Sequence, residues 1–234
     1  MNTNKENILK KHLSKKCIYN ITPFTLLDFT DKTACILWFV GCNMRCTYCY
    51  NPEIVLGKGK LSFDDILPFL QSRIGLLDGV VFSGGECLLQ TNILDIIWQV
   101  KELGFSVKID TNGSKPEILQ TLIEEKLVDF VSLDYKAPEH KFEEITKSSL
   151  YNTFIKSFQI LQKAQIPFEV RTTIHSQLLD TKDILSMQIQ LEALGYQGVF
   201  YVQKFQNDVK TLGNLAPSKP YFKELETSPG ICLR

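Results

Sequence analysis

The sequence predicts an α/β protein built as an open, partial barrel of six β/α units. Short β-branched and aromatic runs, almost continuously apolar, alternate along the chain with amphipathic helical patterns. Strands covered on both faces have this apolar character, and strand–helix alternation is typical of parallel βαβ units. A closed (β/α)8 barrel needs eight units, and we find only six. We therefore expect a partial, open (β/α)6 barrel of the TIM-like kind.

Each element is expected from its own pattern. The six strand-like runs are rich in valine, isoleucine and aromatic residues: Ala34–Val40, Gly79–Phe82, Ser106–Ile109, Asp129–Leu133, Phe168–Thr172 and Gly198–Val202. The helical patterns between them keep one face apolar: Phe63–Ile74, Leu89–Leu103, Pro116–Glu125, Leu150–Lys163 and Thr181–Leu194. In such folds the loops after the strands build the active site, so chemically suggestive residues should follow strands.

Length and charge set the broad class. The 234 residues, 44% of them apolar, suit one domain, which we divide into an N-terminal extension (1–20), a core (21–206) and a C-terminal tail packing on the core (207–234). Lysine plus arginine and aspartate plus glutamate both number 26, which argues against nucleic acid as a partner. The start of the chain is polar, and no apolar run approaches the ~18 residues that span a bilayer. We expect a cytoplasmic protein without membrane contact.

The chain carries seven cysteines, and three of them follow the first predicted strand closely. Cys42, Cys46 and Cys49 have the spacing C-x3-C-x2-C, within reach of one metal centre. Thiolates suit iron–sulfur clusters or zinc. Three ligands would leave one metal position open, as catalytic metal sites need. The alternatives are core cysteines, or a zinc site closed by a distant ligand such as Cys87 or His175.

The run CNMRCTYC resembles the cluster loop of radical S-adenosylmethionine (SAM) enzymes. The resemblance implies that Cys42, Cys46 and Cys49 hold a [4Fe–4S] cluster, whose fourth iron chelates the methionine moiety of SAM. It also implies that Tyr48 lies beside the adenine, although Tyr48 could instead be a core aromatic residue.

The second strand leads into Ser83-Gly84-Gly85-Glu86. Two glycines let the backbone approach a ligand closely, and a glutamate can accept from a cation. Alone, the segment would be a turn. In its place after the cysteine loop it resembles the family's GGE motif, whose backbone and carboxylate meet the SAM ammonium.

Polar residues also follow the third and fourth strands. Asp110, Thr111 and Asn112 stand in DTNG, and Asp134 and Lys136 in DYK. They could serve as turn formers and caps. Both motifs resemble the activating enzymes of glycyl radical enzymes. There the two aspartates and the threonine are associated with a monovalent cation near the SAM carboxylate, and the lysine lies in the same region.

The fifth strand carries an arginine in an apolar run. A buried guanidinium needs an anion, so Arg171 should pair with the SAM carboxylate or form a structural salt bridge with Asp134 or Glu169. His175, at the end of the strand, is expected to be a hydrogen-bonded structural residue rather than a substrate contact.

The resemblance extends over about residues 20 to 205 and is closest to the anaerobic ribonucleoside-triphosphate reductase activating proteins. TPFTLLDF, GCNMRCTYCYNPEIV, SGGECLLQ, KIDTNG, VSLDYKAP and VRTTIH carry it in order. It implies hydrogen abstraction from a glycine Cα of a partner, a glycyl radical enzyme, by a 5′-deoxyadenosyl radical. A flavodoxin- or ferredoxin-type donor would supply the electron. No catalytic side chain is expected beyond the cluster and SAM.

Two alternatives and three departures accompany this hypothesis. One alternative is a small-molecule radical SAM enzyme like the carboxy-deazaguanine synthases, although their cluster loop has an insertion that this chain lacks. The other is a non-enzymatic zinc or iron–sulfur protein. Relatives often carry histidine at Tyr50, Pro-Gly at Thr30-Asp31, and proline or alanine at Cys87.

Overall fold

The computed structural model describes residues 13–219 and 223–234, and the chain packs as two compact units. Unit 1 comprises Met1–Cys42, Glu53–Thr111 and Glu117–Val131, and unit 2 comprises Asn43–Pro52, Asn112–Pro116 and Ser132–Arg234. Residues 1–12 of the expected N-terminal extension and residues 220–222 of the expected tail lie outside the described residues. The boundaries at residues 20 and 206 remain predictions.

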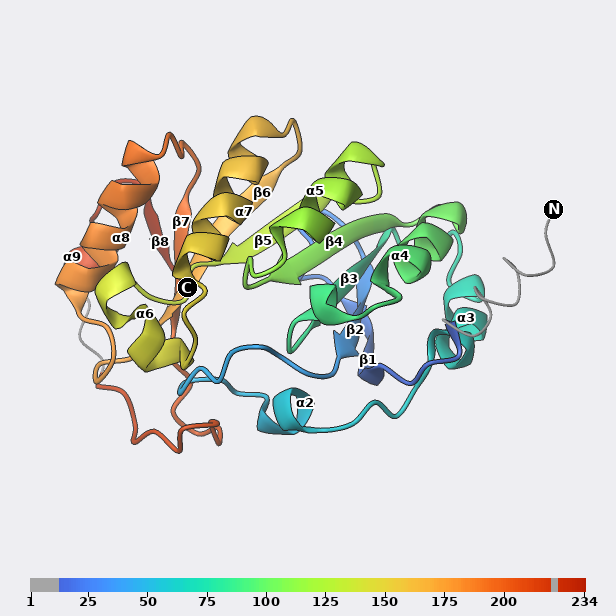
Figure 1. Cartoon of the computed structure of the whole chain (residues 1–234), viewed down its shortest axis with the longest axis horizontal. Coiled ribbons are helices and arrows are strands. Elements are labelled where there is room, and N and C mark those ends of the chain that lie inside the picture. The colour runs from blue at the N-terminus through green and yellow to red at the C-terminus, as the bar shows by residue number, and fades with distance from the viewer. Residues whose placement is uncertain (1–12, 220–222) are drawn as a thin grey trace. The chain divides into compact units, whose positions relative to one another are not determined.

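Eight strands form one sheet in which each strand neighbours the next one in the chain (Figure 1). They are β1 (Ile18–Thr25), β2 (Ala34–Phe39), β3 (Gly79–Gly84), β4 (Ser106–Thr111), β5 (Phe130–Asp134), β6 (Phe168–Ile174), β7 (Phe200–Lys204) and β8 (Ile231–Leu233). The order ends at β1 on one side and at β8 on the other, so the sheet has two edges. The predicted α/β class with an open barrel is confirmed.

The six predicted strands correspond to β2–β7, and β1 and β8 are additions. β1 runs antiparallel to β2 with two irregularities in its register, and β8 runs parallel to β7. Pro23 lies inside β1. Because proline cannot donate a hydrogen bond to a strand ladder, it is confined to edge strands and bulges. Its presence argues against a strand in the sequence, so β1 was not predicted. β8 is only three residues long, too short for a periodic signal.

The helices alternate with the strands along the chain, as the pattern predicts (Figure 1). They are α2 (Pro52–Leu56), α3 (Phe63–Gln71), α4 (Ile93–Glu102), α5 (Pro116–Glu124), α6 (Glu139–Thr146), α7 (Tyr151–Lys163), α8 (Thr181–Ala193) and α9 (Lys223–Glu226), with a 3-10 turn at Cys87–Leu89. Capping boxes start α3 at Ser62 and α8 at Asp180, where each side chain accepts from the backbone three residues on. α2, α6 and α9 were not predicted.

The two faces of the strands differ more than the sequence suggests. In β6, Val170, Thr172 and Ile174 are buried, whereas Glu169 and Arg171 are only partly buried. Side chains alternate along a strand, so Arg171 and Glu169 share the face opposite the buried one. On β4 the same period places Lys108 and Asp110 together on one face. The expectation of nearly continuous apolar strands was therefore wrong for β6, whose second face carries the charged residues of the site.

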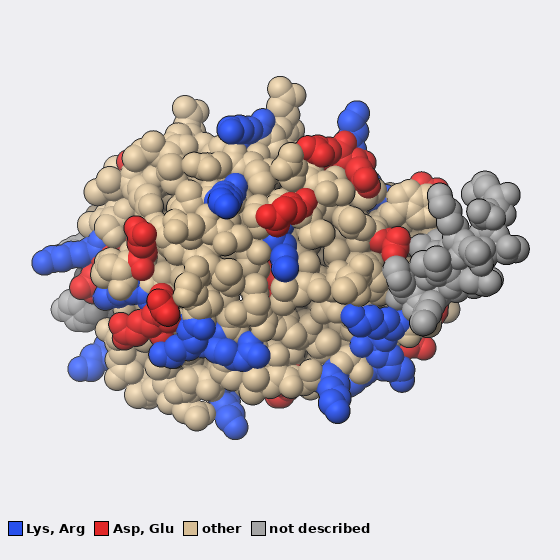
Figure 2. All heavy atoms as spheres, viewed as in Figure 1, with Lys and Arg blue, Asp and Glu red and all other residues tan. Residues whose placement is uncertain are grey.

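The face of the molecule that Figure 2 shows agrees with the balanced composition. Basic and acidic side chains are scattered among each other over the face that Figure 2 shows. No described helix is both long and apolar enough to cross a membrane.

Candidate active site

In unit 1 a glycine turn, defined here as Ser83–Glu86, ends β3. Gly84 has φ of +123°, a conformation that residues with a Cβ rarely adopt, and an added Cβ there would lie 2.3 Å from the Phe39 oxygen. A Cβ on Gly85 would lie 2.0 Å from the Gly41 oxygen and 3.3 Å from the Cys42 Cβ. The backbone of the turn therefore packs directly against the residues that open the cysteine loop.

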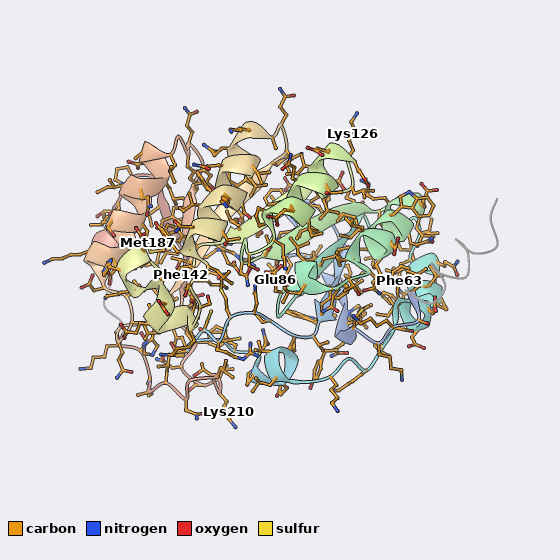
Figure 3. The ribbon with its side chains drawn as sticks, in the orientation of Figure 1. Phe63, Glu86, Lys126, Phe142, Met187 and Lys210 are labelled. Atoms are coloured by element: carbon orange, nitrogen blue, oxygen red, sulfur yellow. The ribbon has the colours of Figure 1, made fainter. Side chains whose placement is uncertain are left out.

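Glu86 is fixed by hydrogen bonds at both its backbone and its carboxylate. Its N–H donates to Gly41 O (2.8 Å), and its Oε1 accepts from the Leu88 N–H (3.1 Å) and the Thr111 hydroxyl (2.9 Å). The side chain is 1% exposed and is labelled in Figure 3. The predicted site residues Glu86 and Thr111 thus contact one another.

Both carboxylate oxygens of Asp110, at the end of β4, contact a polar side chain. Its Oδ2 accepts from the Ser83 hydroxyl at 3.0 Å, and its Oδ1 lies 3.1 Å from the Lys108 ammonium. The Ser83–Asp110 pair joins two residues that the sequence predicts for the site. Lys108 was not predicted, although the same argument that singled out Arg171, a charge inside an apolar strand, would have found it.

In unit 2 the cysteine loop lies against the end of α6. The N–H groups of Arg45 and Thr47 donate to Thr146 O (2.7 Å) and Ile145 O (3.1 Å). These carbonyls belong to the last turn of the helix, where intrahelical donors run out. Within the loop the Cys49 N–H donates to Cys46 O at 3.0 Å, so a tight turn joins the two cysteines.

The tail contacts the same loop from residues 212 and 213. The Leu212 N–H donates to Cys49 O and the Gly213 N–H donates to Thr47 O, both at 2.9 Å. A Cβ on Gly213 would lie 2.7 Å from Thr47 O. Sequence reading expected the tail to pack on the core but did not predict these contacts, because no periodic pattern marks them.

Tyr48 is a buried aromatic residue between the two cysteines of unit 2. It is 4% exposed, and its hydroxyl donates to Lys136 O at 3.2 Å. Burial raises the pKa of its phenol well above the usual range. Asn112, also buried, donates from Nδ2 to Asn43 Oδ1 (3.0 Å) and accepts from the Ser114 N–H (2.9 Å), so the DTNG motif is tied to the cysteine loop through Asn43.

The charge cluster, defined as Asp134, Lys136 and Arg171, is the other predicted group in unit 2. Asp134 Oδ1 accepts from Arg171 Nε at 2.5 Å and its Oδ2 from Lys136 Nζ at 2.9 Å. Burial on its own would raise the pKa of the carboxyl, but the guanidinium and the ammonium outweigh it and lower the pKa to about 2. Burial on its own would lower the pKa of Lys136, but Asp134 together with Tyr48 and Cys46 outweighs it and raises this pKa well above its usual range. Arg171 therefore forms the structural salt bridge that the sequence left as one alternative.

His175 contacts the tail, and Tyr50 contacts the segment just before it. His175 is fully buried; its Nδ1 accepts from the Gln177 N–H at 3.1 Å, so its Nε2 carries the proton and donates to Ala216 O at 2.9 Å. The Tyr50 hydroxyl accepts from the Gln206 N–H at 2.7 Å, and its ring packs on Phe205. The expectation of a structural histidine agrees with these contacts.

The donor set is suited to a cluster with three protein ligands. None of the three loop cysteines is in a disulfide, and both distant residues considered as a fourth ligand have other partners. The Cys87 thiol is fully buried and points to Phe82 O and Asp110 O, and both ring nitrogens of His175 are engaged. Among residues 13–219 and 223–234, no three His, Cys, Asp or Glu side chains are already gathered as a metal site. Metal sites commonly close only when the metal binds.

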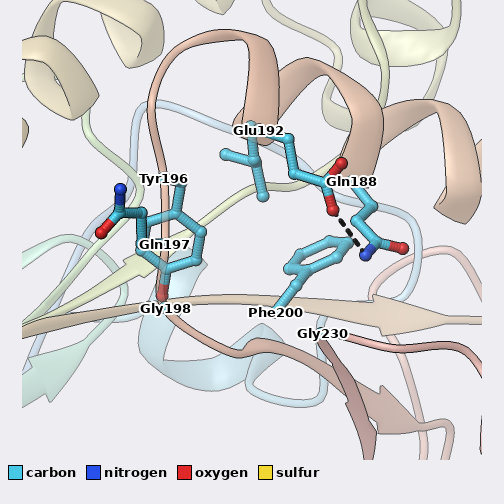
Figure 4. Close-up of a pocket in the computed structure, with 8 residues that line it drawn as sticks. Gln188, Glu192, Tyr196, Gln197, Gly198, Phe200 and Gly230 are labelled. Carbon is cyan, nitrogen blue, oxygen red and sulfur yellow. Dashed lines mark hydrogen bonds between the residues drawn. The ribbon is translucent and has the colours of Figure 1, made fainter.

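A cavity of about 160 Å³ lies elsewhere in unit 2, between α8 and the start of β7 (Figure 4). Phe200 and Tyr196 contribute aromatic surface, and Gln188 donates to Glu192 at 2.8 Å beside them. None of the predicted site residues lines it. Because it adjoins the residues before β7 rather than those after a strand, it is separate from the strand-end loops that carry the site.

Comparison with known proteins gives consistent relatives. A protein of Methanocaldococcus jannaschii that carries the name putative glycyl-radical enzyme activating enzyme is 33% identical over 177 residues, which cover 73% of each chain. The pyruvate formate-lyase-activating enzyme of Clostridium pasteurianum is 35% identical over 126 residues, 51% of this chain and 52% of that protein. The 7-carboxy-7-deazaguanine synthase of Methanopyrus kandleri is 30% identical over 134 residues, 48% and 52% of the two chains. The chain thus spans about half the length of the last two.

Solved structures support the fold. Native anSMEcpe with bound AdoMet superposes with a TM-score of 0.58 at 17% identity, covering 71% of this chain and 49% of that one. QueE from Escherichia coli superposes with a TM-score of 0.56 at 17% identity, covering 87% and 89%. The family model described as the radical SAM superfamily matches residues 36–187, well over half of the chain. This chain therefore belongs to the radical SAM superfamily and is an enzyme resembling the activating enzymes of glycyl radical enzymes.

Proposed function

We propose that this enzyme cleaves SAM reductively and installs a glycyl radical on a partner enzyme, in the first instance an anaerobic ribonucleoside-triphosphate reductase. Membership of the superfamily implies SAM and a [4Fe–4S] cluster as cofactors. A [4Fe–4S] cluster held by Cys42, Cys46 and Cys49 and reduced by an external donor would supply the electron for cleavage of SAM into methionine and a 5′-deoxyadenosyl radical, and a glycine Cα of the partner would be the hydrogen donor. A flavodoxin- or ferredoxin-type protein is the proposed donor.

The protein's own residues would bind and orient rather than react. Cys42, Cys46 and Cys49 would ligate three irons and leave the fourth for SAM. The glycine turn supports the proposal most directly, because Gly85 can carry no side chain against the opening of the cysteine loop. In that role the turn's backbone and the Glu86 carboxylate would meet the ammonium group of SAM.

The remaining predicted residues would shape the surroundings of SAM. Tyr48, Ser83, Asp110, Thr111, Asn112, Asp134, Lys136 and Arg171 are proposed to surround it. Burial of Tyr48 and Glu86 removes water from these positions, which strengthens their electrostatic interactions. In the structure Arg171 is engaged by Asp134, so its contribution would be to hold Asp134 in place.

The first experiment tests SAM cleavage. The protein is reconstituted anaerobically with iron and sulfide, supplied with reductant and SAM, and assayed for 5′-deoxyadenosine. Cys46→Ala should abolish the product, whereas Cys232→Ala, which removes an exposed cysteine outside the loop, should leave it unchanged. No product from the wild type, or product from Cys46→Ala, would refute the proposal.

A second experiment identifies the substrate. A candidate anaerobic reductase is added, and electron-spin-resonance spectra are examined for a glycyl doublet. The similarity to a carboxy-deazaguanine synthase supports one competing function, chemistry on a small molecule. That function predicts that a small-molecule substrate stimulates 5′-deoxyadenosine formation and that the added reductase shows no doublet. A doublet that depends on Cys46 supports the activase.

A further inference from the structure

Lys108 is a buried cation in unit 1 that stands at the start of the segment KIDTNG, where no role is predicted for it from the sequence. It lies in β4, two residues before Asp110 and on the same face, and it is 4% exposed. Its ammonium lies 3.1 Å from Asp110 Oδ1 and donates to the Asp28 carbonyl at 2.5 Å. The Phe130 ring centre is 5.9 Å away. A buried ammonium is costly unless paired, so Asp110 is its counter-ion.

The Asp110 carboxylate is also positioned from its other side. Its Oδ2 accepts from the Ser83 hydroxyl at 3.0 Å, so an ammonium and a hydroxyl together orient the group. Ser83 belongs to the glycine turn, and Lys108 thereby acts on the turn through Asp110. Lys108 is a positioning residue in this arrangement.

The second aspartate is neutralised in the same manner within unit 2. Arg171 and Lys136 contact its two oxygens at 2.5 and 2.9 Å. Asp110 and Asp134 are the carboxylates that the family resemblance associates with a monovalent metal cation. Each of them is therefore paired with a cationic side chain of its own unit.

A metal cation does not fit such a set of ligands. Alkali and alkaline-earth ions bind oxygen ligands, and a carboxylate attracts them through its negative charge. The Lys108 ammonium, 3.1 Å from Asp110 Oδ1, offsets that charge and would repel a second cation at the same group. We propose that this enzyme binds SAM without a monovalent metal cation, because Lys108 neutralises and orients Asp110 from inside the protein. The inference concerns cofactor binding and holds whichever substrate the enzyme acts on.

The test measures SAM affinity of the reconstituted holoenzyme by calorimetry, in potassium chloride and in choline chloride of equal ionic strength. The SAM affinities measured in potassium chloride and in choline chloride should agree within about twofold. A loss of about tenfold or more in choline, equivalent to about 1.4 kcal/mol, would overturn the proposal.

Two variants separate positioning from simple structural support. Lys108→Met should lower both the melting temperature and the SAM affinity, and potassium, but not choline, should restore part of each by taking the place of the ammonium. Lys101→Met is the matched control, because it removes a partly exposed lysine–aspartate pair of the same unit (Lys101–Asp129, 2.8 Å). It should show no potassium effect.

The melting measurements are made on the protein without its cluster, so they stand apart from SAM cleavage and from the proposed function. Destabilisation of Lys108→Met without rescue by potassium, or unchanged SAM affinity, would overturn the positioning role. If Lys108→Met does not fold, Lys108→Met combined with Asp110→Asn removes both charges. That double variant should fold and should show no response to potassium, and a potassium response there would contradict the inference.

Discussion

The glycine turn of unit 1 and the charge cluster of unit 2 are held in place by different physical means. Gly84 and Gly85 are held by steric contact, since their backbone lies where any side chain would collide with Phe39 or Gly41. Asp134 is held by charge, with a guanidinium and an ammonium on its two oxygens. The glycine turn should therefore respond to the size of a side chain, and the charge cluster to charge and pH.

The largest expected effect comes from neutralising the centre of the charge cluster. Asp134→Asn leaves Lys136 and Arg171 without their shared counter-charge, and breaking a buried pair in this way costs about 3–5 kcal/mol. Urea unfolding should show this loss. Asp208→Asn, at an exposed position of the same unit, should change stability by less than about 0.5 kcal/mol. Equal effects of the two substitutions would show that the cluster is not held by charge.

Adding one methyl group should disrupt the glycine turn. Gly85→Ala places a Cβ 2.0 Å from a backbone oxygen that cannot rotate away, and overpacking of this kind costs about 1–3 kcal/mol. We expect the free energy of unfolding, measured by thermal unfolding, to fall by about 3 kcal/mol, and SAM cleavage to be lost.

Gly104→Ala is the matched control for that substitution. Gly104 also has a positive φ (+88°), but nothing lies within 4 Å of its added Cβ. It should cost only the strain of the left-handed backbone, about 1–2 kcal/mol, and leave SAM cleavage intact. If both alanine variants lose activity, steric contact at Gly85 is not the reason.

Acid should weaken the charge cluster selectively. The folded pKa of Asp134 is about 2, below the unfolded value of 3.8, so its stabilisation is complete above about pH 5 and is lost as the pH falls through about 2. This depressed pKa contributes about 2 kcal/mol to the free energy of unfolding. Wild-type stability should therefore fall more steeply between pH 4 and 2 than that of Asp134→Asn. Parallel curves would contradict the depressed pKa.

The smallest effect should come from a steric contact in unit 2. It tests whether steric contact also holds the backbone in the unit where the charge cluster lies. Gly213→Ala brings a Cβ to 2.7 Å from Thr47 O, a less severe approach than at Gly85. We expect a loss of about 1 kcal/mol and lower iron content after reconstitution. Lys210→Ala, exposed on the same tail, should change neither quantity. Normal iron content in Gly213→Ala would show that the tail does not support the cysteine loop.

Much of the fold could be predicted because its signals are local. Strands β2–β7 and helices such as α4 and α7 each carry their pattern within a dozen residues. β1 was missed because Pro23 disguises an edge strand, and α6 because its eight residues include few apolar ones. Boundaries differed by a few residues, as at α4, which begins at Ile93 rather than Leu89.

The contacts within the candidate site were less predictable. Ser83–Asp110 and Glu86–Thr111 join motifs that the sequence had already selected, but their pairing depends on the register of β3 and β4. Lys108 was passed over because its partner Asp110 had been considered only as a ligand, a turn former or a cap, and not as the counter-ion of a buried ammonium. The tail contacts at Leu212 and Gly213 are made by backbone groups, which every sequence possesses.

The family, the α/β class and the residues most suited to hold a cluster could be inferred from the sequence alone, because ligand spacing and strand–helix alternation are local patterns. The folded structure was needed to find the charges that neutralise Asp110 and Asp134, the pairing of Arg171 within the protein, and the contacts between the tail and the cysteine loop. The physical reason is that electrostatic and steric interactions depend on distance in space. Residues such as Asp134 and Arg171, 37 positions apart in the chain, become neighbours only when the strands that carry them are aligned.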